Sequence, residues 1–317
     1  MNRFLAFLFA LCCAGLSVSS AVIAQPADWL HFTLESSREA GTIRADFRDD
    51  RNGRNHNNWS SSFRTADLVG LDLAGFGASG SRPLRFAVIR EAGRLDCIGH
   101  GGESYAGGNC TMTPDPAFVQ LLTARGIGRP SREEAFSLVA LDVRRSLIEA
   151  VAAARYPTPT IDNLIEMTAV GVDARYISDL ARFGYRPKGI HNLVEFRAMD
   201  ITPEYIGGFA RLGYANIPGD DLVQLKALDV DPDYVAAFDR LGYGRLPADD
   251  LVQLKALGVT PDYVAGLQRA GYRRLPVSDL VQLKALDIMP DFARWAAGQR
   301  SPLPPVNELV QMKVNPR

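Results

Sequence analysis

The sequence has few of the residues that usually build metal centres, redox sites or nucleic-acid interfaces. It contains four cysteines and four histidines in 317 residues, and the histidines lack any spacing typical of metal ligands. Basic and acidic residues nearly balance, at 35 and 36, which argues against a cationic surface for nucleic acid. After residue 24 no apolar run is long enough to cross a bilayer. These absences predict a folded protein without a metal ion, a cofactor or a nucleic-acid partner.

The first residues, MNRFLAFLFALCCAGLSVSSAVIAQ, have the pattern of a secretory signal. A positive charge at Arg3 precedes an apolar run from Phe4, and small residues stand at Ala21 and Ala24. We therefore predict a signal peptide over residues 1–24, with cleavage after Ala24. The alternative is an uncleaved anchor in the inner membrane, although serines interrupt the apolar run. The rest of the chain is expected in the periplasm or outside the cell.

The remaining cysteines are predicted to form one disulfide. Signal cleavage removes Cys12 and Cys13 and leaves only Cys97 and Cys110. An even pair of cysteines in an oxidising compartment most simply forms a disulfide, whereas two isolated thiols make a poor metal site. The pair flanks the glycine-rich segment GHGGESYAGGN, so the bond would join the two arms of a hairpin.

Residues 25–112 have the alternation of a small antiparallel β domain, as a sheet or a partly closed barrel. WLHFTLE alternates apolar and polar residues, and IRADFRD, NNWSSSFR, LRFAVIR and RLDCIGH continue in that style between turn-rich stretches. Gly75, Gly77 and Gly80 match the dinucleotide-binding pattern GxGxxG. That motif must open a helix, and a strand-like segment follows here, so we reject a dinucleotide site.

A hydrolase with its site in the β-rich domain is the alternative functional hypothesis. His100, Glu103 and Ser104 lie close together in the sequence and could supply a base and a nucleophile. The serine lacks the flanking glycines of a nucleophile elbow, and no acidic partner stands at a recognisable spacing. We therefore expect a flexible hairpin tip at these residues and no catalytic residue in the chain.

Residues 113–317 contain an internal repeat of 29 residues, in which segments such as DLVQLKALDVDPDYVAAFDRLGYGRLPAD follow one another without insertion. Each copy has two short stretches with apolar residues at three-residue spacing, which predicts two helices that are too short to be stable alone. We therefore predict a two-domain α+β fold, in which the β domain precedes an α-solenoid of helical hairpins. The leucines that anchor the repeat are Leu164, Leu193, Leu222, Leu251, Leu280 and Leu309.

The segment DVDPD, which begins at Asp229, resembles the start of a calcium-binding loop but is better explained by helix ends. Asp229 takes the place of Gly258 in the next copy, where a helix ends in a left-handed residue. Asp231 is predicted to cap the following helix, and Pro232 to begin it. A calcium loop needs glycine where Tyr234 stands. We predict no metal site here.

Tyrosine recurs at two positions of the repeat. One set is predicted to pack between copies, and the set that follows glycine is predicted to pack against the end of the second helix. An aromatic ligand-binding stripe is the alternative. The first set is Tyr176, Tyr205, Tyr234 and Tyr263, with Phe292, and the second is Tyr185, Tyr214, Tyr243 and Tyr272.

One repeat position carries a basic residue and another carries glutamine. Stacked copies would place these side chains in a polar, basic column, here called the ladder. The simpler interpretation of the ladder is a solvated helix face. The functional hypothesis is a binding surface for an unknown protein or an extended anionic ligand of the envelope. The members are Arg197, Lys226, Lys255, Lys284 and Lys313, with Gln224, Gln253, Gln282 and Gln311.

The segment LVQLKALGVTPDYVAGLQRAGY resembles a short helical repeat of exported bacterial proteins. It also resembles the repeats that follow some membrane-embedded metallopeptidase regulators related to the sensors of β-lactam induction. RLDCIGHGGESYAGGNCTMTPDPAFVQLL is similar to the β-rich segment that introduces those repeats, and the resemblance is strongest from about Leu84 onward. It implies an envelope-located sensing or interaction module. It implies no peptidase activity, because the sequence has no HExxH motif.

These features predict an exported, non-enzymatic interaction, scaffold or sensing protein that binds a partner through the repeats. KALGVTPDYVAGL has a faint similarity to a helix-hairpin-helix, which raises nucleic-acid binding as a third hypothesis. Thr260 stands where that motif needs glycine to approach phosphate. Export and balanced charge argue further against nucleic acid.

Overall fold

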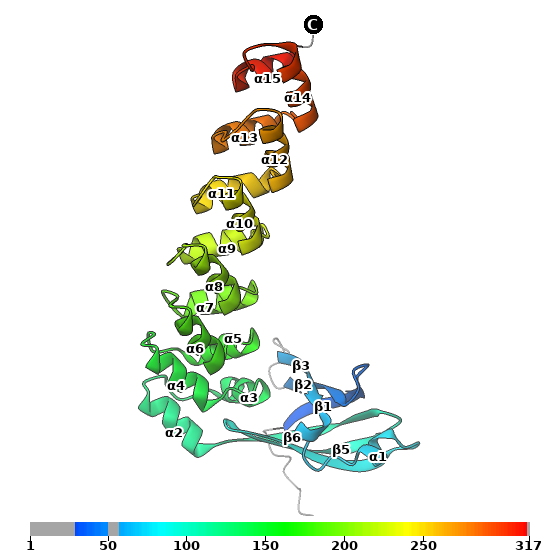
Figure 1. The fold of residues 1–317 in the computed structure, drawn as a ribbon. Coiled ribbons are helices and arrows are strands. Elements are labelled where there is room, and N and C mark those ends of the chain that lie inside the picture. The colour runs from blue at the N-terminus through cyan, green and yellow to red at the C-terminus, as the bar shows by residue number, and fades with distance from the viewer. Residues whose placement is uncertain (1–28, 50–56, 316–317) are drawn as a thin grey trace, which may run out of the picture. The chain divides into compact units, whose positions relative to one another are not determined.

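The computed structural model describes residues 29–49 and 57–315, in which a β-sheet is followed by repeated helices (Figure 1). The predicted signal peptide lies outside the described residues. The described chain divides into two units. The first comprises residues 29–49, 57–64, 72–85 and 97–111, and the second comprises residues 65–71, 86–96 and 112–315. Two short segments that precede residue 112 in the sequence are thus grouped with the helices.

The sheet confirms the predicted antiparallel β architecture. Its six strands lie in the order β3-β2-β1-β6-β5-β4. Side chains alternate as expected of half-buried strands, and in β1 the residues Leu30, Phe32 and Leu34 are buried while His31 and Glu35 are exposed. The strands are β1 Trp29–Ser36, β2 Thr42–Asp49, β3 Asn57–Arg64, β4 Arg82–Arg90, β5 Gly93–Gly102 and β6 Tyr105–Pro114.

The predicted disulfide between Cys97 and Cys110 is present and joins the neighbouring strands β5 and β6. The glycines around it are explained by close contact between the two strands. A Cβ atom on Gly99 would lie 2.2 Å from the carbonyl oxygen of Gly107, and one on Gly108 would lie 2.2 Å from that of Ile98. Larger residues would force the two strands apart at these positions.

Helices α2 to α15 follow the sheet in two rows, and equivalent helices begin 29 residues apart, which confirms the predicted α-solenoid (Figure 1). Each helix from α3 to α13 packs on the next helix of its own row. Row A contains α3 Arg132–Ala140, α5 Ile161–Ala169, α7 Ile190–Ala198, α9 Gly219–Ala227, α11 Ala248–Ala256, α13 Val277–Ala285 and α15 Val306–Val314. Row B contains α2 Pro116–Ala124, α4 Arg145–Ala153, α6 Ala174–Arg182, α8 Pro203–Arg211, α10 Pro232–Arg240, α12 Pro261–Arg269 and α14 Pro290–Gln299.

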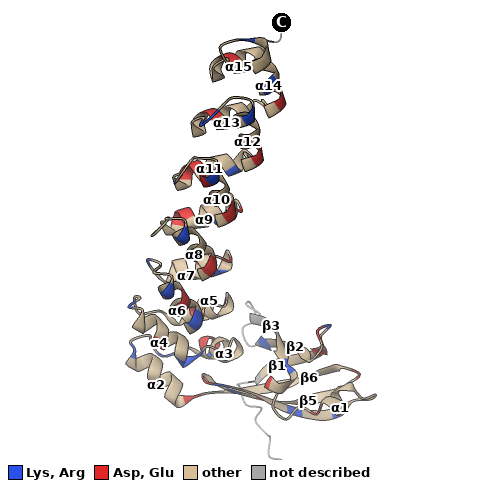
Figure 2. Ribbon diagram, viewed as in Figure 1, with Lys and Arg blue, Asp and Glu red and all other residues tan. Residues whose placement is uncertain are grey.

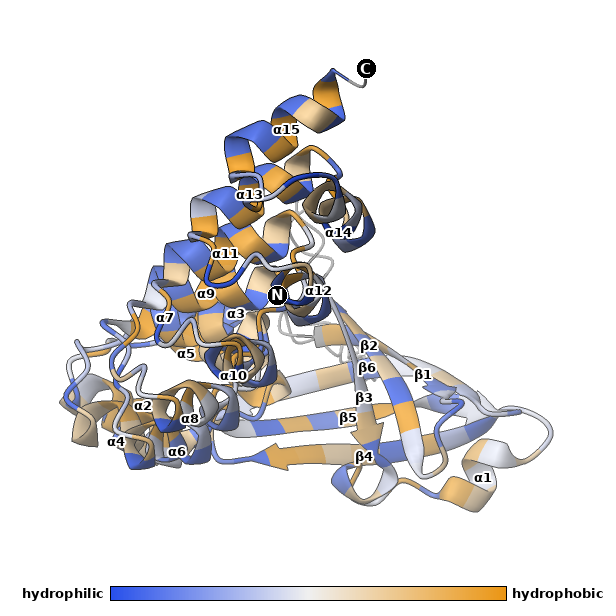
Figure 3. Cartoon of the chain, turned by 45° about the horizontal axis from the view of Figure 1, so that its top comes forward, coloured by the Kyte–Doolittle hydropathy of each residue, from blue (hydrophilic) through white to orange (hydrophobic). Residues whose placement is uncertain are grey.

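Packing between copies stabilises these helices, which are only nine or ten residues long. Apolar and polar residues are interspersed along each of them (Figure 3), and the apolar side faces the neighbouring helices. All six anchoring leucines, from Leu164 to Leu309, have an exposed fraction of 0%. None of the described helices has the length and apolar character needed to traverse a bilayer.

The helix ends confirm the predicted roles of the DVDPD segment. Asp229 has a φ of 57°, in the left-handed region, and Val230 after it is fully buried. The side chain of Asp231 accepts a hydrogen bond of 2.7 Å from the backbone N–H of Tyr234, and α10 begins at Pro232. The acids that mimic a calcium loop are therefore used to end one helix and begin the next.

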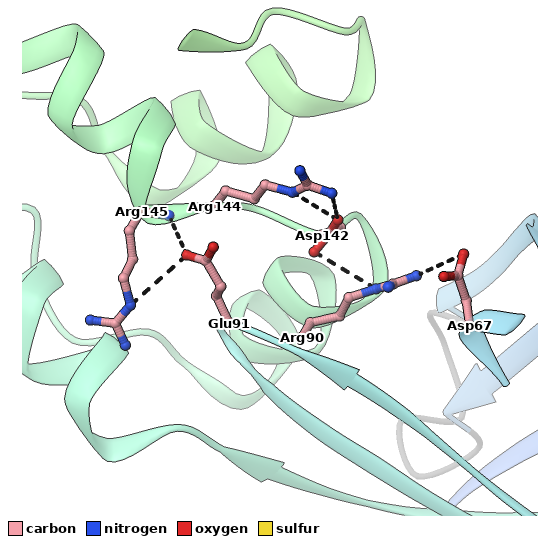
Figure 4. Close-up of polar contacts among 6 residues, drawn as sticks. All are labelled: Asp67, Arg90, Glu91, Asp142, Arg144 and Arg145. Atoms are coloured by element: carbon pink, nitrogen blue, oxygen red, sulfur yellow. Dashed lines mark hydrogen bonds and ion pairs between the residues drawn. The ribbon is translucent and has the colours of Figure 1, made fainter. Parts of the chain in front are cut away.

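Polar contacts join residues 65–71 and 86–96 to the first helices of the repeat region (Figure 4). Arg90, at the end of β4, lies 3.5 Å from a carboxylate oxygen of Asp67 and 3.7 Å from one of Asp142. The backbone N–H of Arg145, the first residue of α4, donates to Glu91 at 2.8 Å. The turn between β4 and β5 is thereby bonded to the first helices of the repeat region.

Candidate functional site

The five basic residues of the ladder lie over aromatic rings of the preceding copy. The Lys255 ammonium is 4.8 Å from the centre of the Tyr234 ring. Such cation–π contacts stabilise a protein by about 0.5–1 kcal/mol at exposed sites. The same arrangement places Arg197 over Tyr176, Lys226 over Tyr205, Lys284 over Tyr263 and Lys313 over Phe292, at 5.1–5.6 Å. The basic half of the ladder thus joins each copy to the next.

The tyrosines beneath these cations also bond across the copies, which confirms that they pack between them. The Tyr234 hydroxyl donates to the carbonyl oxygen of Val259 at 2.8 Å, and Val259 follows the left-handed residue that ends α11. Burial raises the pKa of each of these tyrosines, and that of Tyr263 reaches about 12. The equivalent bonds run from Tyr176 to Ile201, Tyr205 to Val230 and Tyr263 to Ile288.

The glutamine half of the ladder is exposed to solvent. Gln224 and its three equivalents are exposed, whereas the side chain of Lys226 is only 28% exposed. On α9 the exposed residues Asp220, Gln224 and Ala227 are spaced so that they share one face of the helix. We call the four exposed side chains the glutamine column: Gln224, Gln253, Gln282 and Gln311.

Charge along the repeats is mixed (Figure 2). Asp200 lies 3.6 Å from Arg197 and 3.8 Å from Lys226, so one acid offsets the charge of two neighbouring ladder residues. A continuous positive surface, which an extended anionic ligand would need, is therefore interrupted at these copies.

Replacing Lys255 by methionine should lower the free energy of unfolding by about 0.5–1 kcal/mol, because the cation over Tyr234 is lost while most of the side-chain volume stays. Replacing the exposed Gln253 by alanine, two residues away on α11, is the matched control and should change stability by less than about 0.5 kcal/mol. Urea unfolding followed by circular dichroism measures both. Equal effects of the two substitutions would contradict a structural role for the cation.

The residues of the hydrolase hypothesis do not form a catalytic arrangement. Glu103 and Ser104, with φ of 54° and 68°, form the two-residue turn between β5 and β6. Their N–H groups donate to the carbonyls of Ala78 and Phe76 at 2.7 and 2.9 Å, so neither can stabilise an oxyanion. His100 is exposed on β5, and no hydrogen bond between it and Ser104 occurs in the described chain. The expected hairpin tip is this turn, and the two hydrogen bonds join it to the segment before β4.

Other chemistry-bearing side chains are dispersed. Across residues 29–49 and 57–315, no three histidine, cysteine or acidic side chains come together in a way that could hold a metal ion. Gly75 and Gly77 lie in the five-residue helix α1, Leu73–Gly77, and Gly80 lies in the turn before β4. These glycines shape a loop between a short 3-10 turn, Thr65–Asp67, and a strand.

Sequence reasoning missed the pairing of each ladder cation with an aromatic ring of the preceding copy. The signal was the constant offset of 21 residues between them, as from Tyr234 to Lys255, but an offset of this length does not show that two side chains meet. No family model matches the chain, and no curated protein is significantly similar to it. Function is therefore inferred from the geometry of the repeats.

Proposed function

We propose that the protein is an exported, non-enzymatic interaction protein, a scaffold or a sensor, that binds an extended segment of a partner protein along the glutamine column. The supporting observation is that a glutamine side chain is exposed at the same repeat position in successive copies. The neighbouring lysines instead lie over aromatic rings. A glutamine side chain both donates and accepts hydrogen bonds, so a column of them suits the alternating N–H and C=O groups of an extended backbone. Repeat proteins present such extended surfaces to partners.

The compartment we propose is the periplasm or the cell exterior. The disulfide between Cys97 and Cys110 supports this, because disulfides persist in oxidising compartments. The signal-like pattern of the first residues and the resemblance of the repeat to those of exported bacterial proteins point the same way.

A capture experiment with a surface variant tests the proposal. The mature chain is immobilised and exposed to envelope extract, beside a triple variant, Gln224→Ala, Gln253→Ala and Gln282→Ala. Each lost hydrogen bond weakens binding by about 1 kcal/mol, so capture by the triple variant should fall at least about tenfold. The control is the double variant Arg240→Ala and Arg269→Ala, which changes exposed residues of row B and should capture the partner normally.

Two outcomes would overturn the proposal. One is that the wild-type chain captures no protein above background. The other is that the triple variant captures the same partner as strongly as the wild type. Circular dichroism of each variant shows whether the fold is kept, as expected for substitutions at exposed positions.

A further inference from the structure

A row of partly exposed leucines lies beside the glutamine column. Leu257 and Leu286 are 40% and 38% exposed, and Leu228 is half-buried at the same repeat position. The backbone N–H of each leucine donates to the carbonyl oxygen of the glutamine four residues earlier, at 3.2 Å. Residues four apart share one face of a helix, so each leucine lies one turn from a member of the glutamine column. We call Leu228, Leu257 and Leu286 the leucine column.

A small exposed residue borders both columns in each of these copies. Ala227, Ala256 and Ala285 are exposed and stand three residues after the glutamine, which places them on the same face of the helix. Because alanine carries only a methyl group, a partner backbone can come close to the helix at this point. Each of α9, α11 and α13 thus presents an amide, a small apolar residue and a leucine in the same arrangement.

The leucine column is a continuous feature of three copies. Single exposed leucines are common on protein surfaces. Here they occupy one position on helices that pack on each other, α9 on α11 and α11 on α13, so their apolar surfaces lie in a row. The helices on either side differ at this position, since α7 ends at Met199 and α15 ends at Asn315. The surface that repeats therefore extends over three copies.

The spacing of the copies selects the conformation of the partner segment. The axes of packed helices lie about 8–10 Å apart. A polyproline II segment presents every third residue on one side, at intervals of about 9 Å. A β-strand presents every second residue, at intervals of about 7 Å or, for every fourth residue, about 13 Å. An α-helix bonds its own backbone N–H and C=O groups, so it offers the glutamines no backbone partners. Of these conformations, polyproline II matches both columns.

We propose that the two columns together bind a segment of a partner protein in the polyproline II conformation, with apolar side chains at every third residue. Three of these side chains, at positions i, i+3 and i+6 of the segment, contact the three leucines. The glutamines of the same copies bond the backbone of the segment, whose N–H and C=O groups are free because polyproline II has no internal hydrogen bonds. This inference rests on the proposed function and specifies the conformation and the apolar period of the partner.

The test uses a fluorescent peptide of three Leu-Pro-Ser repeats as the probe, titrated with the mature full-length chain and followed by fluorescence anisotropy. The matched control peptide has the same composition, with its three leucines at every second residue. We expect saturable binding of the first peptide. The second should bind at least about tenfold more weakly, because no two of its leucines can contact neighbouring copies at once in this conformation.

Two double variants test where the peptide binds. Leu257→Ala with Leu286→Ala removes most of the leucine column and should weaken binding of the first peptide at least about tenfold. Ile89→Ala with Ile98→Ala removes two isoleucines of the sheet that are 49% and 57% exposed, and it should leave binding unchanged. Circular dichroism of both variants shows whether the fold is kept, as expected for substitutions at exposed positions.

The proposal is overturned if the control peptide binds as tightly as the first, if the first shows no saturable binding, or if the leucine variant binds it like the wild type. Equal weakening by the isoleucine variant would also overturn it, because the effect would then be general. Failure of the proposed function looks different: the triple glutamine variant then captures the partner from envelope extract as strongly as the wild type. If that variant loses its partner while the leucine variant captures it normally, the leucine inference fails and the proposed function stands.

Discussion

Raising the pH above about 10 should unfold the helical repeats, because buried tyrosines hold their protons more tightly in the folded chain than in the unfolded one. Burial raises the pKa of tyrosines along the whole repeat region, and for Tyr185 and Tyr263 the pKa reaches about 12 against an ordinary value of 10. The set comprises Tyr156, Tyr176, Tyr185, Tyr205, Tyr214, Tyr234, Tyr243, Tyr263 and Tyr272.

The sign follows from proton linkage. Below pH 10 both states keep the phenol protons, so the full stability is present. Above it the unfolded chain loses them first, and the free energy of unfolding falls with each further unit of pH until the folded-state pKa is passed. Because several tyrosines contribute in the same direction, their losses add. The repeats should therefore lose their stability over a narrow range between about pH 10 and 12.

An alkaline titration checks this by following tyrosinate absorbance and far-ultraviolet circular dichroism together. The two signals should change together, because the buried tyrosines ionise only when the helices come apart. Return to neutral pH should restore the helical signal, which separates unfolding from alkaline damage to the chain. Tyr263→Phe removes one ionising group and should make the loss of stability with pH less steep. Complete ionisation of the tyrosines with an unchanged helical signal would contradict the prediction.

Replacing Leu251 by alanine should lower the free energy of unfolding by about 3 kcal/mol, because this leucine is fully buried in α11 and the substitution leaves a cavity. A copy in the middle of the array packs on neighbours at both ends, so the loss extends beyond one hairpin. Leu257→Ala, six residues later, is the matched control. Its side chain is 40% exposed, and the change should cost less than about 1 kcal/mol.

Urea unfolding of the two variants measures this difference. A shift of the midpoint with Leu251→Ala, and little shift with Leu257→Ala, is the expected result. If the two substitutions lower the free energy of unfolding equally, the buried leucine does not anchor the repeat, and the assignment of the anchor position is wrong. The same comparison at the buried Leu280 and the exposed Leu286 tests whether the copies are energetically alike.

Local chemistry made much of the fold predictable. The 29-residue period can be read directly from the sequence. The left-handed residue at Asp229, the cap at Asp231 and the start of α10 at Pro232 depend on residues a few positions apart. Such features depend on short-range backbone geometry, for which individual residue types have strong preferences at helix ends. The alternation that predicted the β strands is equally local.

Contacts between residues distant in the sequence could not be predicted in this way. The ladder residues were predicted to form one polar, basic surface. In the structure Lys255 lies over the Tyr234 ring, whereas Gln253 is exposed. Which ladder side chains contact the preceding copy depends on the orientation of one copy relative to the next. The sequence pattern within a single copy does not specify that orientation. The contact of residues 86–96 with the helices likewise brings together residues distant in the sequence, such as Arg90 and Asp142.

The sequence by itself determined the repeat, its helix ends, the alternating strands and the cysteine pair, because short-range geometry and burial of a periodic apolar face specify these features. Only the tertiary structure decided which polar side chains of the ladder remain exposed. Stacking of the copies covers the cations with aromatic rings and leaves the glutamines in solvent.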